Sequence, residues 1–599
     1  MTAALPLSSP AQDDAPGASP VVFGSALVAV ALPVLLAYNL PPSSTFLNQA
    51  AALVGWGLFC AMLAATLPRQ ATATAAASGG LRSLVVALML LLGAVVVSMF
   101  HSGLPSGLGL SSLGLIGAAI LVACTAAAVQ QAGEGDTAFE VFCVALLAAA
   151  LASVAIAIVQ YFFPALADGD VLARASSPGR VGANLRQPNH LSSLLLAALA
   201  GLVWLHDRRE RRAAPPSPAL RAGTVAVALL LVFGVVLTVS RTGTVCIVML
   251  ALWGVIDRRL SKFTRAMLWL VPLVYVLCWM GVSEWSAAQA HAFAGESQLH
   301  KSDLSSSRFG IWSNTLALIR MHPWAGVGWG EFNFAWTLTP FPGRPVAFFD
   351  HTHNLPLQFA VELGLPLATL VLVLLAAALW GALQCARRAV PADLPSVRCG
   401  LAMVLMMAVH SLLEYPLWYA YFLLPTAFAF GIAVGGRRDA DARPARAGRV
   451  LLAGGVLLAV GGLFSFADYL RVVQIFAPGS EPPPLEQRIE SGRRSVFFAH
   501  HAHYAAVTTA TYPSTEMPGF EVAPHYLLDA RLMVAWAKAL NERGDVERAR
   551  YVAERLKEFN HPEGDKFFAV CADAAAEPLP FQCAPATKSF TSEDFRGTP

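Results

Sequence analysis

The amino-acid sequence predicts an all-α, polytopic integral membrane protein. Of its 599 residues, 56% are hydrophobic and only 13% are charged, which is too apolar for a soluble globule with a solvated surface. Apolar runs follow one another along the chain, and about 13 of them are long enough to cross roughly 30 Å of hydrocarbon. We therefore expect about 13 transmembrane helices, a large hydrophilic loop over residues 283–354, and a small helical domain at the C-terminus.

The predicted spans lie on both sides of the hydrophilic loop. They are expected near residues 21–39, 48–67, 83–100, 113–130, 138–162, 190–205, 222–240, 243–257, 266–283, 355–380, 399–414, 418–436 and 450–468. The tail before them, residues 1–20, contains no Lys or Arg and so lacks the basic start of a cleavable signal peptide. We expect a transmembrane domain over residues 21–469 and a C-terminal domain over residues 470–599.

Lys and Arg residues collect in alternate loops, which predicts the orientation of the chain. The basic loops contain Arg69 and Arg82; Arg208, Arg209, Arg211, Arg212 and Arg221; Arg258, Arg259, Lys262 and Arg265; Arg387, Arg388 and Arg398; and Arg437, Arg438, Arg443, Arg446 and Arg449. Short basic loops stay in the cytoplasm. The N-terminal tail is therefore expected there, with the 283–354 loop and the C-terminal domain on the other side, which in a Gram-negative cell is the periplasm.

Several arginines lie on the predicted outer side, against this distribution of charge. The segment 163–189 contains Arg174, Arg180 and Arg186, and Arg241 begins a span after a tight turn. An arginine at membrane depth is costly to desolvate unless an anion or a partner is present. Any one of them could extend to the lipid headgroups instead, but the set favours an anion-binding site. The net charge of +3 is small and scattered, so nucleic-acid binding is not supported.

The 283–354 loop ends in two histidines, His351 and His353. Loops of this length between spans are usually functional. Alternate residues of an extended segment point the same way, so the pair could bind a metal, but a hard metal acting on diphosphate prefers carboxylates and only Asp350 is near. We predict no metal site.

Two other polar segments have simpler explanations than a ligand site. The run from Gly326 to Gly330 contains three glycines, but it lacks the strand-turn-helix context of a phosphate loop, and we predict a tight turn. His500, His501 and His503 have no Cys or carboxylate at metal-ligand spacing, and we predict a surface histidine group.

The outer arginines and the histidine pair together suit one kind of reaction. Arginine binds phosphate oxygens bidentately and stays charged at physiological pH. Histidine, with a pKa near 6.5, can accept a proton from a hydroxyl group near neutral pH. Glycosyl transfer from a lipid-linked diphosphate needs both, because the leaving group is an anion and the nucleophile requires a general base.

Four motifs resemble the signature of the bacterial O-antigen ligase and O-antigen polymerase superfamily. They are His353-Asn354 followed after nine residues by Gly364, Arg186-Gln187-Pro188-Asn189-His190, Ser240-Arg241-Thr242-Gly243, and Ser307-Arg308. With the segment from His351 to Asn354, the segment from His410 to Trp418 and the C-terminal domain, the chain is most similar to protein O-oligosaccharyltransferases of the PglL type. The motifs lie within residues 170–435.

The resemblance implies a GT-C-like glycosyltransferase of the bacterial inner membrane, with its active site facing the periplasm. It implies en bloc transfer of an oligosaccharide from undecaprenyl diphosphate to Ser or Thr hydroxyls of a pilin or other periplasmic protein. The reaction would be inverting and metal-independent, and no cofactor is implied. The other expected partners are membrane lipids.

The expected catalytic residues are His353, His351 and Arg241. We assign His353 as the general base because it is the histidine of the motif, while His351 could orient the loop or the acceptor. The expected substrate-binding residues are Arg180, Arg186, Arg308, Asn189, Asn354, His410, Glu414 and Tyr415. Among these, arginines would bind the diphosphate and Asn354 could fix the imidazole tautomer. His410, Glu414 and Tyr415 could line the acceptor or lipid entrance, or form only a polar turn.

Other functions remain open at this point. A ligase that attaches glycan to lipid A core, or an O-antigen polymerase, would share the motifs. A lipid or solute transporter would more often contain paired halves with broken helices, and we find no such repeat. A non-catalytic anchor for the C-terminal domain would not need the histidine motif.

The C-terminal domain shows helical periodicity over Tyr526–Leu540 and Val546–Phe559, with Asp545 as a predicted N-cap. One such helix pair resembles a tetratricopeptide unit, although a single copy is weak evidence. Cys571 and Cys583 could form a disulfide in an oxidising compartment.

Overall fold

The computed structural model describes residues 19–67, 78–212, 217–295, 303–341, 343–346, 348–388, 394–436, 447–572 and 579–597. Over these ranges the chain is α-helical and contains no β-strand, as predicted. The predictions for most of the N-terminal tail, for Arg69 and for the basic loop at 437–446 concern residues outside these ranges.

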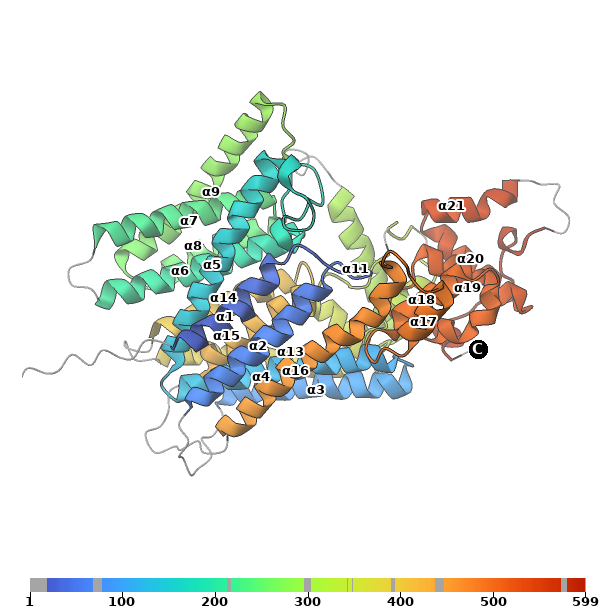
Figure 1. Ribbon diagram of the computed structural model, residues 1–599, viewed down its shortest axis with the longest axis horizontal. Coiled ribbons are helices and arrows are strands. Elements are labelled where there is room, and N and C mark those ends of the chain that lie inside the picture. The colour runs from blue at the N-terminus through green and yellow to red at the C-terminus, as the bar shows by residue number, and fades with distance from the viewer. Residues whose placement is uncertain are drawn as a thin grey trace, which may run out of the picture.

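The helices follow the predicted apolar runs. They are α1 (Pro20–Leu35), α2 (Phe46–Thr66), α3 (Gly79–His101), α4 (Ser106–Gln131), α5 (Gly135–Phe162), α6 (Pro188–Arg212), α7 (Pro218–Thr238), α8 (Arg241–Ile256) and α9 (Lys262–Ala288), then α13 (Leu355–Arg388), α14 (Leu394–Ser411), α15 (Ala420–Gly435) and α16 (Ala447–Phe476) (Figure 1). Among the described helices, nine are long and apolar enough to cross a membrane. This confirms a polytopic membrane protein.

The remaining four apolar runs, in α1, α8, α14 and α15, form shorter helices. At a rise of 1.5 Å per residue, a helix of about 16 residues extends roughly 24 Å, less than the 30 Å of a typical hydrocarbon core. The count of thirteen spans therefore stays a prediction.

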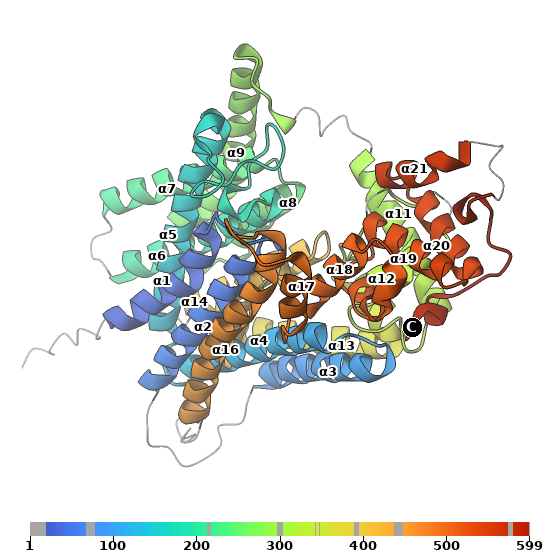
Figure 2. The ribbon, with the colours of Figure 1, turned by 45° about the vertical axis from the view of Figure 1, so that its right-hand side comes forward.

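The transmembrane helices pack around a buried aromatic cluster. Helix α2 contacts α1 and α16, and α3 contacts α13, so segments far apart in sequence lie side by side (Figure 2). The ring centroids of Trp56, Phe59 and Phe142 lie 5.0–5.6 Å from that of Phe428. The Trp56 ring also lies 5.6 Å from the ring of Phe59 and 6.1 Å from that of Phe142. Each aromatic side chain buries a large apolar area, and together they hold α2, α5 and α15 in place.

A kink in α13 depends on glycine. The helix is interrupted at Gly364, whose φ of 74° suits a residue without Cβ. A tight turn lies against the kink, and the Val327 and Gly328 N–H groups donate to α13 carbonyls at 2.9 and 3.0 Å. A Cβ on Gly326 would lie 2.5 Å from the backbone carbonyl of Glu362. The predicted turn at 326–330 is confirmed, and it supplies donors to carbonyls that the kink leaves without helical partners.

The C-terminal part is a stack of short helices, namely α17 (Leu485–Arg493), α18 (Ala499–Thr509), α19 (Ala530–Glu542), α20 (Val546–Glu558) and α21 (Pro562–Phe568). Helices α19 and α20 confirm the predicted pair. Asp545 caps α20 by accepting a hydrogen bond from the Arg548 N–H, and Cys571 and Cys583 form a disulfide.

The hydrophilic loop and these C-terminal helices share one hydrophobic core, which the sequence did not predict. The loop contains α11 (Asp303–Met321) and α12 (Phe332–Leu338). Trp336 of α12 lies 5.5 Å from the Phe559 ring. Buried Glu331 accepts a 2.8 Å hydrogen bond from His525 Nδ1. Residues that precede the histidine motif are therefore fixed by the C-terminal helices.

The prediction of a surface histidine group was wrong for His500 and His501. Both side chains are buried, and both rings pack on the ring of Tyr526. Burial lowers the pKa of His501 to about 3. The reason is that α18 turns this polar sequence toward the interior of the helical stack.

Candidate active site

The predicted site residues meet where the hydrophilic loop reaches the start of α13. His353 lies two residues before α13 and has a φ of 56°, a conformation that costs a non-glycine residue about 1 kcal/mol or more. Its Nδ1 lies 3.1 Å from the carbonyl oxygen of His351. Its Nε2 lies 3.5 Å from Glu414 Oε2. The strained backbone thus presents one ring nitrogen to the loop and the other to the residue after α14.

Glu414 is the centre of the polar network. Besides facing His353, its carboxylate forms an ion pair with Arg308 of α11 and accepts a 3.0 Å hydrogen bond from Asn189 Nδ2 of α6. The residue is only 8% exposed, so its negative charge is screened weakly by solvent. The network joins residues separated by 106 and 225 positions in the sequence.

Asn189 extends the network toward Arg180. The Asn189 Oδ1 atom accepts hydrogen bonds from Ser240 Oγ at 2.7 Å and from Arg180 Nη2 at 3.4 Å. Ser240 is also the N-cap of α8, where its hydroxyl accepts from the Gly243 N–H at 3.0 Å. The motif residues of α6 and α8 therefore hold each other in position.

Three of the four predicted arginines lie in one region. Burial lowers the pKa of Arg180, the Glu414 carboxylate opposes this shift, and Arg241 and Arg308 add to it. These charges are therefore within electrostatic range of one another. Arg186 lies apart, with Nη1 donating to the Ser44 carbonyl at 2.6 Å.

His351 packs among aromatic rings. It stacks on Tyr415 with ring centroids 4.4 Å apart, and it meets Trp418 edge to face at 4.7 Å. His353 contacts the Tyr415 ring in a T-shaped arrangement at 4.9 Å. His351 Nδ1 also lies 3.0 Å from Asp350 Oδ1. The Tyr415 ring thus contacts both histidine rings.

Two predicted site residues have positions other than those expected. Asn354 caps α13 by accepting from the Leu357 N–H at 3.0 Å and donates to the Leu412 carbonyl, so the His351 carbonyl, rather than Asn354, meets the His353 ring nitrogen. His410 is fully buried and lies 2.7 Å from the hydroxyl of Ser193. It lies inside the helix bundle rather than at an entrance.

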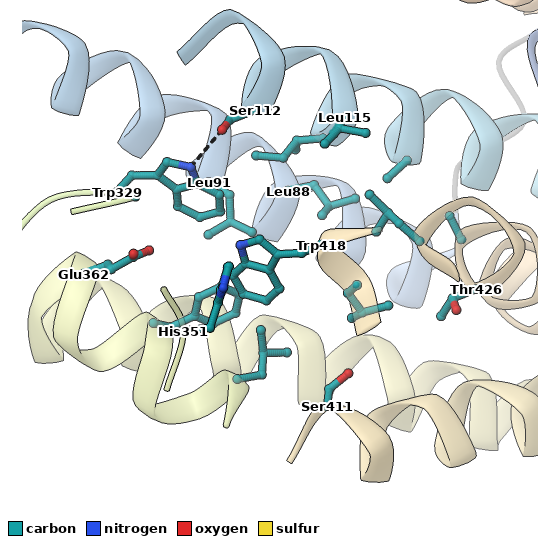
Figure 3. Close-up of a pocket in the computed structure, with 18 of the residues that line it drawn as sticks. Leu88, Leu91, Ser112, Leu115, Trp329, His351, Glu362, Ser411, Trp418 and Thr426 are labelled. Atoms are coloured by element: carbon teal, nitrogen blue, oxygen red, sulfur yellow. Dashed lines mark hydrogen bonds between the residues drawn. The ribbon is translucent and has the colours of Figure 1, made fainter. Parts of the chain in front are cut away.

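An apolar cavity of about 430 Å³ opens beside His351. Its walls are formed by α3, α4, α13, α14 and α15, and its polar lining includes Asp350, Glu362 and Ser112. Figure 3 shows the rings of His351 and Trp418 together near leucines of α3, with the Trp329 indole donating to Ser112. A cavity of this composition can accept a hydrocarbon chain.

Glu414 and its three partners were all predicted site residues, but their pairing was not predicted. Trp418 and the cavity were not predicted as parts of the site. The available signal was the acidic residue at the end of a span, since a carboxylate near membrane depth needs a cation. The number of candidate cations left the pairing undetermined.

Three segments of the chain match known families. Residues 225–372 match the family described as O-antigen ligase, and residues 181–206 match protein glycosylation ligase. Residues 399–574 match the family described as virulence factor membrane-bound polymerase, C-terminal. Together these segments include His353, Glu414 and the C-terminal helices.

Two curated relatives come from Acinetobacter baylyi (strain ATCC 33305 / BD413 / ADP1). Its general O-oligosaccharyltransferase is 26% identical over 269 residues, which cover 44% of this chain and 45% of that protein. Its ComP-specific O-oligosaccharyltransferase is 27% identical over 287 residues, 46% of each chain. The matched region thus spans a little less than half the length of each relative. These matches confirm the resemblance predicted from the motifs: the chain is similar to the bacterial O-antigen ligase and polymerase superfamily and, within it, to protein O-oligosaccharyltransferases of the PglL type.

Proposed function

We propose that this protein transfers an oligosaccharide en bloc from undecaprenyl diphosphate to serine or threonine hydroxyls of pilin or other periplasmic proteins. It would act from the inner membrane with its site facing the periplasm. The observation that carries the proposal is the Glu414 carboxylate, which contacts His353, Arg308 and Asn189. It joins a candidate general base to a candidate phosphate-binding cation, and the likeness to O-oligosaccharyltransferases supports the same reaction.

The proton is taken up at Nε2 of His353. A carbonyl oxygen can only accept a hydrogen bond, so the 3.1 Å contact with the His351 carbonyl assigns the proton of the neutral ring to Nδ1. Nε2 then has a free lone pair. It removes the proton from the acceptor hydroxyl as that oxygen attacks the anomeric carbon of the glycan.

Glu414 stabilises the cation that this step creates. Once Nε2 is protonated, the imidazolium charge lies 3.5 Å from Glu414 Oε2. A carboxylate placed beside the second nitrogen of a catalytic histidine has this role in other enzymes that use a histidine base. Here Glu414 faces the nitrogen that accepts the proton, so the hydroxyl has to approach Nε2 beside the carboxylate.

The leaving group is stabilised by arginine. As the bond between the anomeric carbon and the diphosphate oxygen breaks, its electron pair stays on the diphosphate, and Arg308, Arg241 and Arg180 stabilise that charge. Attack in line with the departing group inverts the anomeric carbon without a covalent enzyme intermediate. The proton on His353 then passes to solvent or to the departing diphosphate, which restores the base.

A second candidate function is attachment of the glycan to a lipid acceptor such as lipid A core. The apolar cavity beside His351 favours it, because the cavity can hold a hydrocarbon chain close to the proposed base. If the acceptor is a protein, the cavity would instead hold the donor lipid or an apolar part of that protein.

Vesicle assays separate these candidates. The purified protein is reconstituted with undecaprenyl-diphosphate oligosaccharide and offered a serine-containing protein or a lipid A core acceptor. We expect glycan on the protein, with inverted anomeric configuration by NMR. Transfer only to the lipid would favour the second candidate, and transfer to neither would contradict the proposed function.

A further inference from the structure

The C-terminal helices contain a surface groove that the proposed chemistry does not use. It encloses about 410 Å³ between the end of α18 and the turn after it, α19 and α21. One face of α19 forms a side of the groove through Arg531, Val534, Ala535 and Lys538. These positions, i, i+3, i+4 and i+7, share one face of a helix.

The two basic residues on this face of α19 lie outside the shared core, although Ala535 between them is buried in it. The opposite face buries Leu532, Met533 and Trp536 in the shared core, whereas Arg531 and Lys538 are exposed. The two basic side chains are therefore not needed to hold α19 in place. Their presence beside a groove requires another explanation.

The groove combines positive charge with an apolar floor. Arg531, Lys538 and Lys566 line it, and Glu563 is its one acidic lining residue. With the described part of the chain, none of the three cations forms an ion pair. Among the apolar lining residues, Phe567 is buried. We propose that the groove binds an acidic, extended segment of the protein acceptor, an inference that depends on the proposed function for the identity of the partner.

The spacing of the charges defines the segment. Arg531 and Lys538 are separated by about 10 Å along α19 at 1.5 Å per residue. An extended chain advances about 3.3 Å per residue and turns alternate side chains to the same face. Acidic residues two to four positions apart on one face of the segment would therefore meet both cations, and a small apolar side chain on that same face would reach the floor.

The recessed floor favours a peptide over a lipid headgroup, since a headgroup would meet the cations and leave the apolar residues without a partner. The groove also belongs to the unit that fixes the catalytic loop. Helix α20, which packs on α19, contacts α12 of the loop. A segment bound here would lie on the helices that pack against the loop preceding His353.

Binding is measured first, without any transfer reaction. A fluorescein-labelled nonapeptide with Glu at positions 1, 5 and 9 and Val at positions 3 and 7, all on one face of an extended chain, is titrated with the full-length protein in detergent, beside its Gln counterpart. We expect only the Glu peptide to bind, with affinity falling as salt rises. The double variant Arg531→Glu/Lys538→Glu should weaken binding by roughly tenfold, since it removes two exposed ion pairs with the peptide. Arg543→Glu, also exposed but at the end of α19 outside the groove, should leave it unchanged.

Equal binding of both peptides, or full binding by the double variant, would overturn the proposal. So would a site that takes only phosphatidylglycerol vesicles and loses them in the double variant. In the transfer assay, adding the Glu segment to an acceptor peptide should lower KM about tenfold in the wild type but not in the double variant, with kcat unchanged. If the wild type glycosylates neither peptide, the proposed function fails, and the binding result alone decides whether the groove takes an acidic peptide.

Discussion

Replacing Glu414 with Gln removes one negative charge beside His353 and keeps a side chain of almost the same shape. The two groups lie 3.5 Å apart in this structure. At an effective dielectric constant of about 20, opposite unit charges at that distance attract by roughly 5 kcal/mol. Arg308 pairs with the same carboxylate and offsets part of this attraction, so we take about 2 kcal/mol as the loss. Since about 1.4 kcal/mol changes a rate tenfold, transfer should slow roughly 30-fold.

The same substitution should change the pH dependence. Burial lowers the pKa of His353 below its ordinary value, and Glu414 acts in the opposite direction. The base is therefore unprotonated at neutral pH, and transfer should decline as the pH falls through this pKa. Without the carboxylate the pKa falls further. The acid limb of the profile should move to lower pH while the plateau rate decreases.

The assay follows transfer in vesicles at saturating donor from about pH 8 down to the lowest pH at which the protein stays folded, because burial lowers the pKa of His353. Glu210→Gln is a matched control, since Glu210 is partly buried and also pairs with an arginine, Arg221, but lies at the opposite end of α6 from Asn189. Its profile should equal that of the wild type. An acid limb that stays in place in Glu414→Gln, with an unchanged plateau, would refute the role given to Glu414.

Three further predictions concern the cation site, the kink and the topology. Arg308→Lys should lower transfer on the order of 10²-fold, because lysine lacks the planar fork that holds two phosphate oxygens; transfer within a few-fold of wild type would make Arg308 structural. Gly364→Ala should lower the melting temperature by several degrees, since a Cβ would meet the Trp324 carbonyl oxygen and φ is 74°; an unchanged melting temperature would show that the kink can relax. Reporter fusions after Arg494 should behave as periplasmic, and cytoplasmic behaviour would reverse the predicted orientation.

The membrane helices were predictable because each depends on its own run of apolar residues. Every predicted run overlaps one helix, although several runs extend a few residues beyond its end, as 21–39 does beyond α1. The kink at Gly364 was not predictable in the same way, because it depends on the turn at Gly326 packing against it. The shared core of the loop and the C-terminal helices was missed for a similar reason. Glu331 and His525 meet across 194 positions, and neither residue indicates its partner.

The site was predictable in its residue types and less so in its connections. The motifs singled out His353 and Arg308, and the expected chemistry gave them their roles, because it requires a base and a cation. The motif spacing did not identify a partner for Glu414. Many cations were available in the sequence, and the packing of α6, α11 and α14 decides which of them pairs with Glu414. Because His410 ends a span, the sequence left open whether it lines an entrance or belongs to a polar turn, and the helix turns its side chain toward Ser193.

The most direct test of the account compares His353→Ala with His351→Ala in the same vesicles, measuring both transfer rate and binding of the lipid-linked donor. A general base contributes about 10²–10⁴ in rate, so His353→Ala should reduce the transfer rate at least about 10²-fold. The arginines should still bind the donor. His351→Ala should retain measurable transfer, since its ring stacks on Tyr415 and does not face Glu414. Full transfer by His353→Ala, or loss of its donor binding in place of its chemistry, would contradict the assignment of His353 as the base.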